Sequence, residues 1–169
     1  MDIVVANQGS NTVSVLLSNG NGTFAQAVNY TAGMTPTSVF AANFDNINGV
    51  DLAITNQGSA TVSILLNRGN GTFESLQQYV TGSMPSSVFA TDFDGTNGID
   101  LAVANLNSNN VSVLLNNGNG TFRSPFNYDT GRNSTSVFAT DFDDDDDNDL
   151  AVTNYSDDNV SVLLNPLNP

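Results

Sequence analysis

The 169-residue chain contains no histidine, cysteine, tryptophan or lysine. Without cysteine there is neither a disulfide framework nor a thiolate metal site. The chain also lacks an imidazole base, a thiolate and an amine nucleophile, which excludes the usual catalytic triads and Schiff-base chemistry. A pair of carboxylates could still hydrolyse a glycoside, but the acidic residues outside the loops described below do not recur. We therefore predict that the protein is not an enzyme.

Positive charge and long apolar segments are also scarce. The net charge is −14, with three arginines as the only basic side chains, whereas nucleic-acid binding requires clustered Lys and Arg. No apolar run approaches the roughly 20 residues that span a bilayer. The N-terminus lacks the basic and apolar segments of a signal peptide. We expect no nucleic-acid partner, no membrane insertion and no signal peptide in this chain.

The most informative feature present is an internal repeat of forty-nine residues. A six-residue sequence motif, beginning with Asp and ending with Asn, recurs at residues 2–7, 51–56, 100–105 and 149–154 without insertion or deletion. The units are 2–50, 51–99, 100–148 and a partial 149–169, within a single domain or part-domain spanning 1–169. Such a period indicates a solenoid, a propeller or an array.

Each unit reads as four β-strands, which we call A to D in blade order. In one such set, which runs from the second unit into the third, A covers residues 87–91, B covers 100–105, C covers 111–115, and D runs from Phe122 to about residue 129. Asn-Gly pairs at 117–120 predict a tight hairpin between C and D. β-branched residues dominate the apolar runs, and no 3.6-residue period develops. The predicted class is all-β.

Four antiparallel strands in a repeat of this length favour a β-propeller built of four-stranded blades. The A strands are rich in alanine, which suits the narrow end of a blade near the axis, and the D strands are polar, which suits a solvated outer edge. A three-sided β-helix is the structural alternative, although its repeats are shorter and lack hairpin turns.

An acidic loop lies between A and B in each complete unit. The loop 141–149 places carboxylates at positions 1, 3, 5 and 9, a spacing that suits Ca²⁺, which takes six to eight oxygen ligands. Seven carboxylates in nine residues also repel one another, at about 0.5 kcal/mol per pair near 8 Å in water. The alternative is a solvated acidic turn that binds no metal. We predict a calcium site, with Mg²⁺ as the other candidate ion. The candidate metal residues are Asn43, Asp45 and Asp51 in the first loop, Asp92, Asp94, Thr96, Gly98 and Asp100 in the second, and Asp141, Asp143, Asp145, Asp147 and Asp149 in the third.

The three loops differ at position 5, which is Ile47, Thr96 and Asp145 in turn. Ile47 has no side-chain ligand and Thr96 offers only a hydroxyl. The affinity should therefore rank third loop, then second, then first. Position 6, where calcium loops need a left-handed residue, holds Asn48, Asn97 and Asp146, and Asn and Asp can reach that conformation.

Residues 92–103, together with 111–115 and 118–122, resemble the FG-GAP/VCBS repeats of integrin-α-type propellers. The resemblance implies a secreted or extracellular parent protein that binds calcium between strands A and B. On the family pattern the third loop matches apart from Asp146 in a glycine place, and the second matches at Asp92, Asp94 and Asp100. It also implies a non-enzymatic scaffold or binding module of the adhesion type, with an extracellular protein or glycan as ligand. The ligand surface would lie at the end opposite the metal loops, on the D-to-A and B-to-C connections.

A lectin-like propeller with sugar sites between its blades is the alternative function. Its favoured stacking residue, tryptophan, is absent. The periodic Tyr30, Tyr79 and Tyr128 could stack on a sugar or could pack over the blade rim.

The strand order BCD, ABCD, ABCD, ABC amounts to about three and a half blades. Unclosed ends expose sheet edges, and propellers close with four or more blades. We therefore expect a homo-oligomer that closes a shared ring, and a dimer is the oligomer that we favour. Seven four-stranded blades and eight imperfect ones are the competing counts. The chain would then be a fragment, natural or engineered, of a longer propeller.

Overall fold

The computed structural model describes residues 2–47 and 49–165, and these form β-strands and turns without any helix. Each strand pair is antiparallel, as the hairpin signals predict. Within the described residues there is accordingly no helix that could cross a bilayer. The strands, in chain order, are β1 (Ile3–Asn7), β2 (Thr12–Leu16), β3 (Val28–Thr31), β4 (Pro36–Ala42), β5 (Asp51–Asn56), β6 (Thr61–Leu65), β7 (Gln77–Val80), β8 (Pro85–Thr91), β9 (Asp100–Asn105), β10 (Asn110–Leu114), β11 (Phe126–Asp129), β12 (Ser134–Thr140), β13 (Asp149–Asn154) and β14 (Asn159–Leu163).

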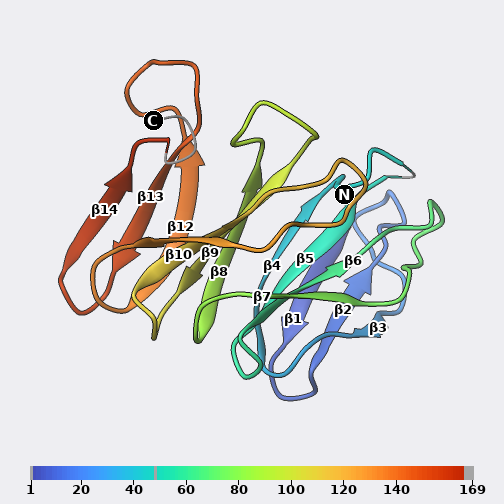
Figure 1. Cartoon of the computed structure of the whole chain (residues 1–169). Helices are drawn as coiled ribbons and strands as arrows, with labels where there is room; N and C mark the ends of the chain where they lie inside the picture. The colour runs from blue at the N-terminus through green and yellow to red at the C-terminus, as the bar shows by residue number, and fades with distance from the viewer. Residues whose placement is uncertain (1, 48, 166–169) are drawn as a thin grey trace.

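The strands form four sheets that stand side by side like blades (Figure 1). Sheet 1 contains β1-β2-β3, sheet 2 contains β4-β5-β6-β7, sheet 3 contains β8-β9-β10-β11, and sheet 4 contains β12-β13-β14. Each sheet is a meander in which every strand pairs with its neighbours in the chain. The predicted order BCD, ABCD, ABCD, ABC and the all-β propeller class are confirmed.

The start of the D strand differs from the prediction. In sheet 3 the strand begins at Phe126, and Phe122 makes only an isolated bridge with Asn116. The Phe122 side chain is buried between the sheets, and Phe24 and Phe73 make the same kind of isolated bridge in sheets 1 and 2. The outer strand is therefore short, and its polar residues form the edge that the sequence predicts.

The inner edge is formed by β4, β8 and β12, which lie next to one another. Their phenylalanines form a ladder in which the ring centroids of Phe40 and Phe89 are 5.1 Å apart and those of Phe89 and Phe138 are 5.0 Å apart. The Ser86 hydroxyl donates a hydrogen bond of 3.0 Å to the backbone oxygen of Ser134 in the next sheet. The small A-strand residues thus lie where the sheets converge, as expected for a propeller axis.

The hydrophobic core lies between sheets rather than within one layer. Between sheets 2 and 3, Val62 and Ile64 pack against Leu101 and Val103, and equivalent clusters lie between sheets 1 and 2 and between sheets 3 and 4. Strands β5 and β9 are buried on both faces because each lies between two such cores. Burial of this kind, rather than strand propensity, stabilises the fold.

A glycine in each D-to-A turn packs against the asparagine that ends strand B. A Cβ atom added to Gly82 would lie 2.7 Å from Cγ of Asn105, which is fully buried. We expect Gly82→Ala to lower the free energy of unfolding by about 1 to 3 kcal/mol through overpacking, as measured by urea denaturation. Gly9→Ala is the control, because nothing lies within 4 Å of a Cβ there. Equal losses for both variants would contradict the steric explanation.

Candidate functional site

The three acidic loops join β4 to β5, β8 to β9 and β12 to β13, so they lie at the same end of the sheets (Figure 1). Two of them bring carboxylates together. In the second loop, oxygens of Asp92, Asp94 and Asp100 all lie within 4.8 Å of one another, and in the third loop Asp141, Asp143 and Asp145 do the same. Six of the predicted metal residues thus converge in two clusters.

The first loop is arranged differently. The amide oxygen of Asn43 is buried and accepts no hydrogen bond from the described residues, while Asp45 accepts one of 2.8 Å from the backbone N–H of Ile47. An oxygen that burial leaves unpaired is costly unless another donor or a cation satisfies it. Ile47, at position 5, offers no side-chain oxygen. For this reason the first loop has the lowest predicted metal affinity of the three.

Asp141 organises the third loop from within. Its two carboxylate oxygens accept hydrogen bonds from four backbone N–H groups, of which the shortest, from Asp144, is 2.7 Å. Burial works to raise the pKa of Asp141, but these four donors together lower it below its usual value. Asp141 is therefore held as an anion at the start of the loop.

Asp143 has the opposite environment. Partial desolvation raises its pKa, and repulsion from Asp145, Asp149 and Asp141 raises it further. The carboxylates that converge here thus disfavour one another's charge. A divalent cation among them would remove that repulsion, which is the property expected of a metal loop.

Other predicted ligands have local partners. The hydroxyl of Thr96 donates a hydrogen bond of 2.8 Å to Asp94, and the backbone N–H of Asp147 donates one of 3.0 Å to Asp145. Gly98 adopts a φ of 99°, at the position whose backbone oxygen the calcium pattern uses. Whether these three ligate a metal stays a prediction.

The backbone fulfils the requirement for left-handed residues. Position 6 has φ of 60° at Asn97 and 71° at Asp146, so Asn and Asp do take the conformation that glycine usually supplies. Asn48, at the same position of the first loop, lies outside the described residues. Position 4 is left-handed as well, at Asn46, Gly95 and Asp144.

The last aspartate of each loop has a structural role that sequence reasoning did not find. One oxygen of Asp100 accepts a hydrogen bond of 2.9 Å from the backbone N–H of Phe93, and the other accepts one of 2.8 Å from Asn116. Asp51 and Asp149 make the same pair of contacts. This aspartate therefore ties the A–B loop to the C–D turn. The signal in the sequence is that this aspartate recurs in every copy of the repeat, at residues 2, 51, 100 and 149.

Asp100 bears the cost of its position. It is fully buried, and desolvation raises its pKa to about 6. The charges of Asp94 and Asp92 also raise this pKa, whereas the two backbone N–H donors lower it. Desolvation likewise raises the pKa of Asp51. A cation at the loop would favour the charged form of both groups.

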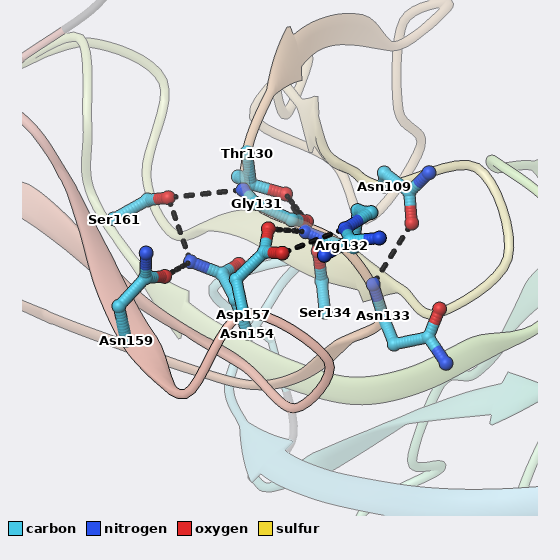
Figure 2. Close-up of polar contacts among 10 residues, drawn as sticks. All are labelled: Asn109, Thr130, Gly131, Arg132, Asn133, Ser134, Asn154, Asp157, Asn159 and Ser161. Carbon is cyan, nitrogen blue, oxygen red and sulfur yellow. Dashed lines mark hydrogen bonds and ion pairs between the residues drawn. The ribbon is translucent and has the colours of Figure 1, made fainter.

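The opposite end of sheets 3 and 4, where the family resemblance places a ligand surface, is a network of polar turn residues (Figure 2). Arg132 forms an ion pair of 2.6 Å with Asp157, and the backbone N–H of Asn133 donates a hydrogen bond of 2.8 Å to Asn109. The backbone N–H of Gly131 donates to the Ser161 hydroxyl at 3.1 Å. These contacts join one turn to the next, and a ligand at this end stays a prediction.

Two of the periodic tyrosines pack between sheets. Tyr30 lies edge-to-face against Phe73, with centroids 5.0 Å apart, and Tyr79 lies in the same way against Phe122 at 5.5 Å. The Tyr30 hydroxyl donates a hydrogen bond of 3.2 Å to the backbone oxygen of Gly71. These rings are engaged as the rim-packing alternative expects, so they offer the lectin-like function no support.

Comparison with known proteins agrees with this architecture. Residues 92–152 match the model of the FG-GAP-like repeat family. No curated protein matches the chain. Among solved structures, it is similar to selenomethionine-substituted virginiamycin B lyase from Staphylococcus aureus, with a TM-score of 0.58 and 13% identity over 99% of this chain and 53% of that one. It is also similar to BBS1N in complex with ARL6DN, with a TM-score of 0.58 and 11% identity over 98% of this chain and 56% of that one.

At these identities the likeness concerns the fold alone. The chain spans about half the length of both structures. The family match covers the second and third acidic loops, which are the two that bring three carboxylates together.

Proposed function

Because the chain carries FG-GAP-like repeats in a β-propeller fold, we propose that it is a non-enzymatic scaffold or binding module stiffened by calcium. The observation that carries the proposal is the convergence of three carboxylates in each of two equivalent hairpins. Calcium favours such oxygen-rich, flexible loops, whereas Mg²⁺ demands stricter octahedral geometry and retains more water. Calcium is therefore the expected ion.

The residues that would hold calcium are Asp141, Asp143 and Asp145 in the third loop. In the second loop they are Asp92 and Asp94, with Asp100 beside them. Bound calcium would neutralise the converging carboxylates and fix strand A against strand B. Weak calcium sites of surface modules suit the millimolar calcium outside cells, so we also propose an extracellular setting.

Calcium is expected to stabilise the fold measurably. At a concentration about 100 times the Kd, each site adds about 2.7 kcal/mol to the free energy of unfolding, which raises the Tm by several degrees. Calorimetric titration should find the tightest site abolished by Asp143→Asn and the second weakened by Asp94→Asn. Magnesium should bind more weakly in the same titration.

Asp129→Asn is the matched control, because it removes one negative charge from an exposed strand end outside the loops. It should leave calcium binding unchanged. A chain that releases no heat with calcium and melts at the same temperature in chelator would rule out the metal function.

Self-association is the second part of the proposal, and it is supported by the two terminal sheet faces. On sheet 4, Phe138, Phe142, Val160, Val162 and Leu164 are exposed. Their equivalents in sheets 2 and 3 line the cores between sheets. Val162, for example, is 52% exposed, whereas the equivalent Val113 is fully buried.

Sheet 1 presents the complementary face. Its Ile3, Val5 and Phe24 are exposed, and one repeat later the equivalent side chains Leu52, Ile54 and Phe73 are buried against sheet 1. The two terminal faces are thus the two halves of the contact that the chain already makes three times. We infer that two copies associate head to tail, with sheet 4 of one copy packed on sheet 1 of the other.

A further inference from the structure

The inner edge of sheet 1 differs from that of the other sheets. In sheets 2, 3 and 4 the B strand pairs with an A strand on its inner side, as β9 does with β8. Strand β1 pairs with β2 and, within the described residues, with no other strand. Its inner edge therefore presents backbone groups that another strand can bind.

A cavity lies beside this edge. It has a volume of about 480 Å³, lies between sheets 1 and 2, and is lined by Val4, Val15, Leu17, Leu52 and Phe73 among others.

The next contact between sheets shows what such a space accommodates. The equivalent side chains there, Ala53, Ile64, Leu66, Leu101 and Phe122, surround the fully buried Phe44. The rings of Phe44 and Phe122 are 5.7 Å apart and nearly perpendicular. Phe44 comes two residues after the A strand of sheet 2, so the cavity beside β1 is shaped for the phenylalanine that follows such a strand.

A hydrogen-bond acceptor stands at the same place. Asp51, Asp100 and Asp149 each accept the backbone N–H of that phenylalanine through one oxygen and the N–H of the C–D turn through the other. Asp2, their equivalent, accepts the N–H of Ser18 at 2.8 Å through Oδ1. Its Oδ2 accepts no hydrogen bond from the described residues, which leaves it available for an incoming N–H.

We propose that the inner edge of β1 and this cavity form a strand-acceptor site, which binds an extended peptide of the pattern Ser-Val-Phe-Ala-x-x-Phe. The peptide adds to sheet 1 as an antiparallel strand. The pattern is that of residues 38–44, 87–93 and 136–142. In the register of β8 on β9, the guest valine lies opposite Val5, its first phenylalanine lies opposite Val4, and its last phenylalanine enters the cavity.

Charge selects among such peptides. The chain carries a net charge of −14, and the carboxylate of Asp2 lies at the site, so an uncharged guest is favoured over an acidic one. The segment 36–44 contains no charged residue, whereas residues 87–93 and 136–142 each contain an aspartate. A peptide with the sequence of residues 36–44 is therefore the probe of choice.

The test titrates the whole chain into that peptide, capped at both ends and labelled with a fluorophore, and follows fluorescence anisotropy. A control peptide carries alanine in place of the last phenylalanine and should bind about tenfold or more weakly, because its ring is what the cavity buries. Asp2→Ala in the chain should also weaken binding, whereas Asp129→Ala should not. Hydrogen exchange should slow at the amides of β1 on binding.

Two results would overturn the proposal. One is equal affinity for the two peptides, since that would mean the cavity takes no part. The other is protection of an outer edge, such as β3 or β14, in place of β1. The titration is run in calcium and in chelator, and the site uses no loop carboxylate, so loss of the calcium function would leave the expected binding unchanged.

Discussion

Replacing Asp100 with alanine is expected to lower the free energy of unfolding by about 2 to 4 kcal/mol, in chelator as well as in calcium. The change leaves the backbone N–H groups of Phe93 and Asn116 without their acceptor, and each unsatisfied buried group costs about 1 to 3 kcal/mol. Part of that loss is offset, because the variant no longer buries a carboxylate whose pKa desolvation raises to about 6. The two lost hydrogen bonds exceed the relief of one buried charge.

Urea denaturation in chelator measures how much unfolding free energy the Asp100→Ala variant loses through its missing hydrogen bonds, without any contribution from bound calcium. Asp94→Ala is the control, since Asp94 is only half-buried and its hydrogen bonds are to Thr96 within the same loop. It should cost less than about 1 kcal/mol in chelator and show its main effect as lost calcium stabilisation. If Asp100→Ala were as stable as Asp94→Ala in chelator, the structural role of Asp100 would be wrong.

The sequence predicts the architecture well because the repeat and the turn residues are local signals. Residues 100–105 form β9 as expected, and Gly118 and Gly120 take the positive φ that the predicted hairpin requires. Sheet order then follows from short connections, since neighbouring strands joined by tight turns must pair with each other.

The candidate site is predictable only in part, because ligand spacing says nothing about competing partners. The spacing identifies the carboxylates that converge, such as Asp141 and Asp143. It does not reveal that Thr96 donates to Asp94, or that Asp100 accepts an N–H from Asn116, sixteen residues away. These contacts depend on how the C–D turn lies over the A–B loop, which is a tertiary feature.

The predicted start of strand D was wrong for a related reason. Phe122 alternates with its neighbours as a strand residue would, but its ring packs against Phe44 and Tyr79 of the preceding sheet. Pairing between sheets competes there with pairing within the sheet. A periodic pattern alone cannot distinguish the two kinds of burial.

Charged substitutions on the two terminal faces are expected to abolish self-association. Val162→Glu blocks the face of sheet 4, and Val5→Glu blocks the face of sheet 1, because either contact would bury an unpaired carboxylate. Light scattering should give a mass of at least two chains for the unmodified protein and that of one chain, 17.7 kDa, for each variant. Val80→Glu is the control: Val80 is 68% exposed on an outer strand, and Asp129 occupies the equivalent position one repeat later.

Mixing the two variants decides the geometry of the interface. Each keeps the face that the other has lost, so a head-to-tail contact predicts that the mixture forms a pair of two chains joined by one intact interface and unable to extend. A contact between identical faces predicts otherwise, because one variant alone would remain associated while the other dissociated. An unmodified protein that stays at 17.7 kDa at all concentrations would show that the two faces do not pair. A mixture that remains monomeric would exclude the head-to-tail contact.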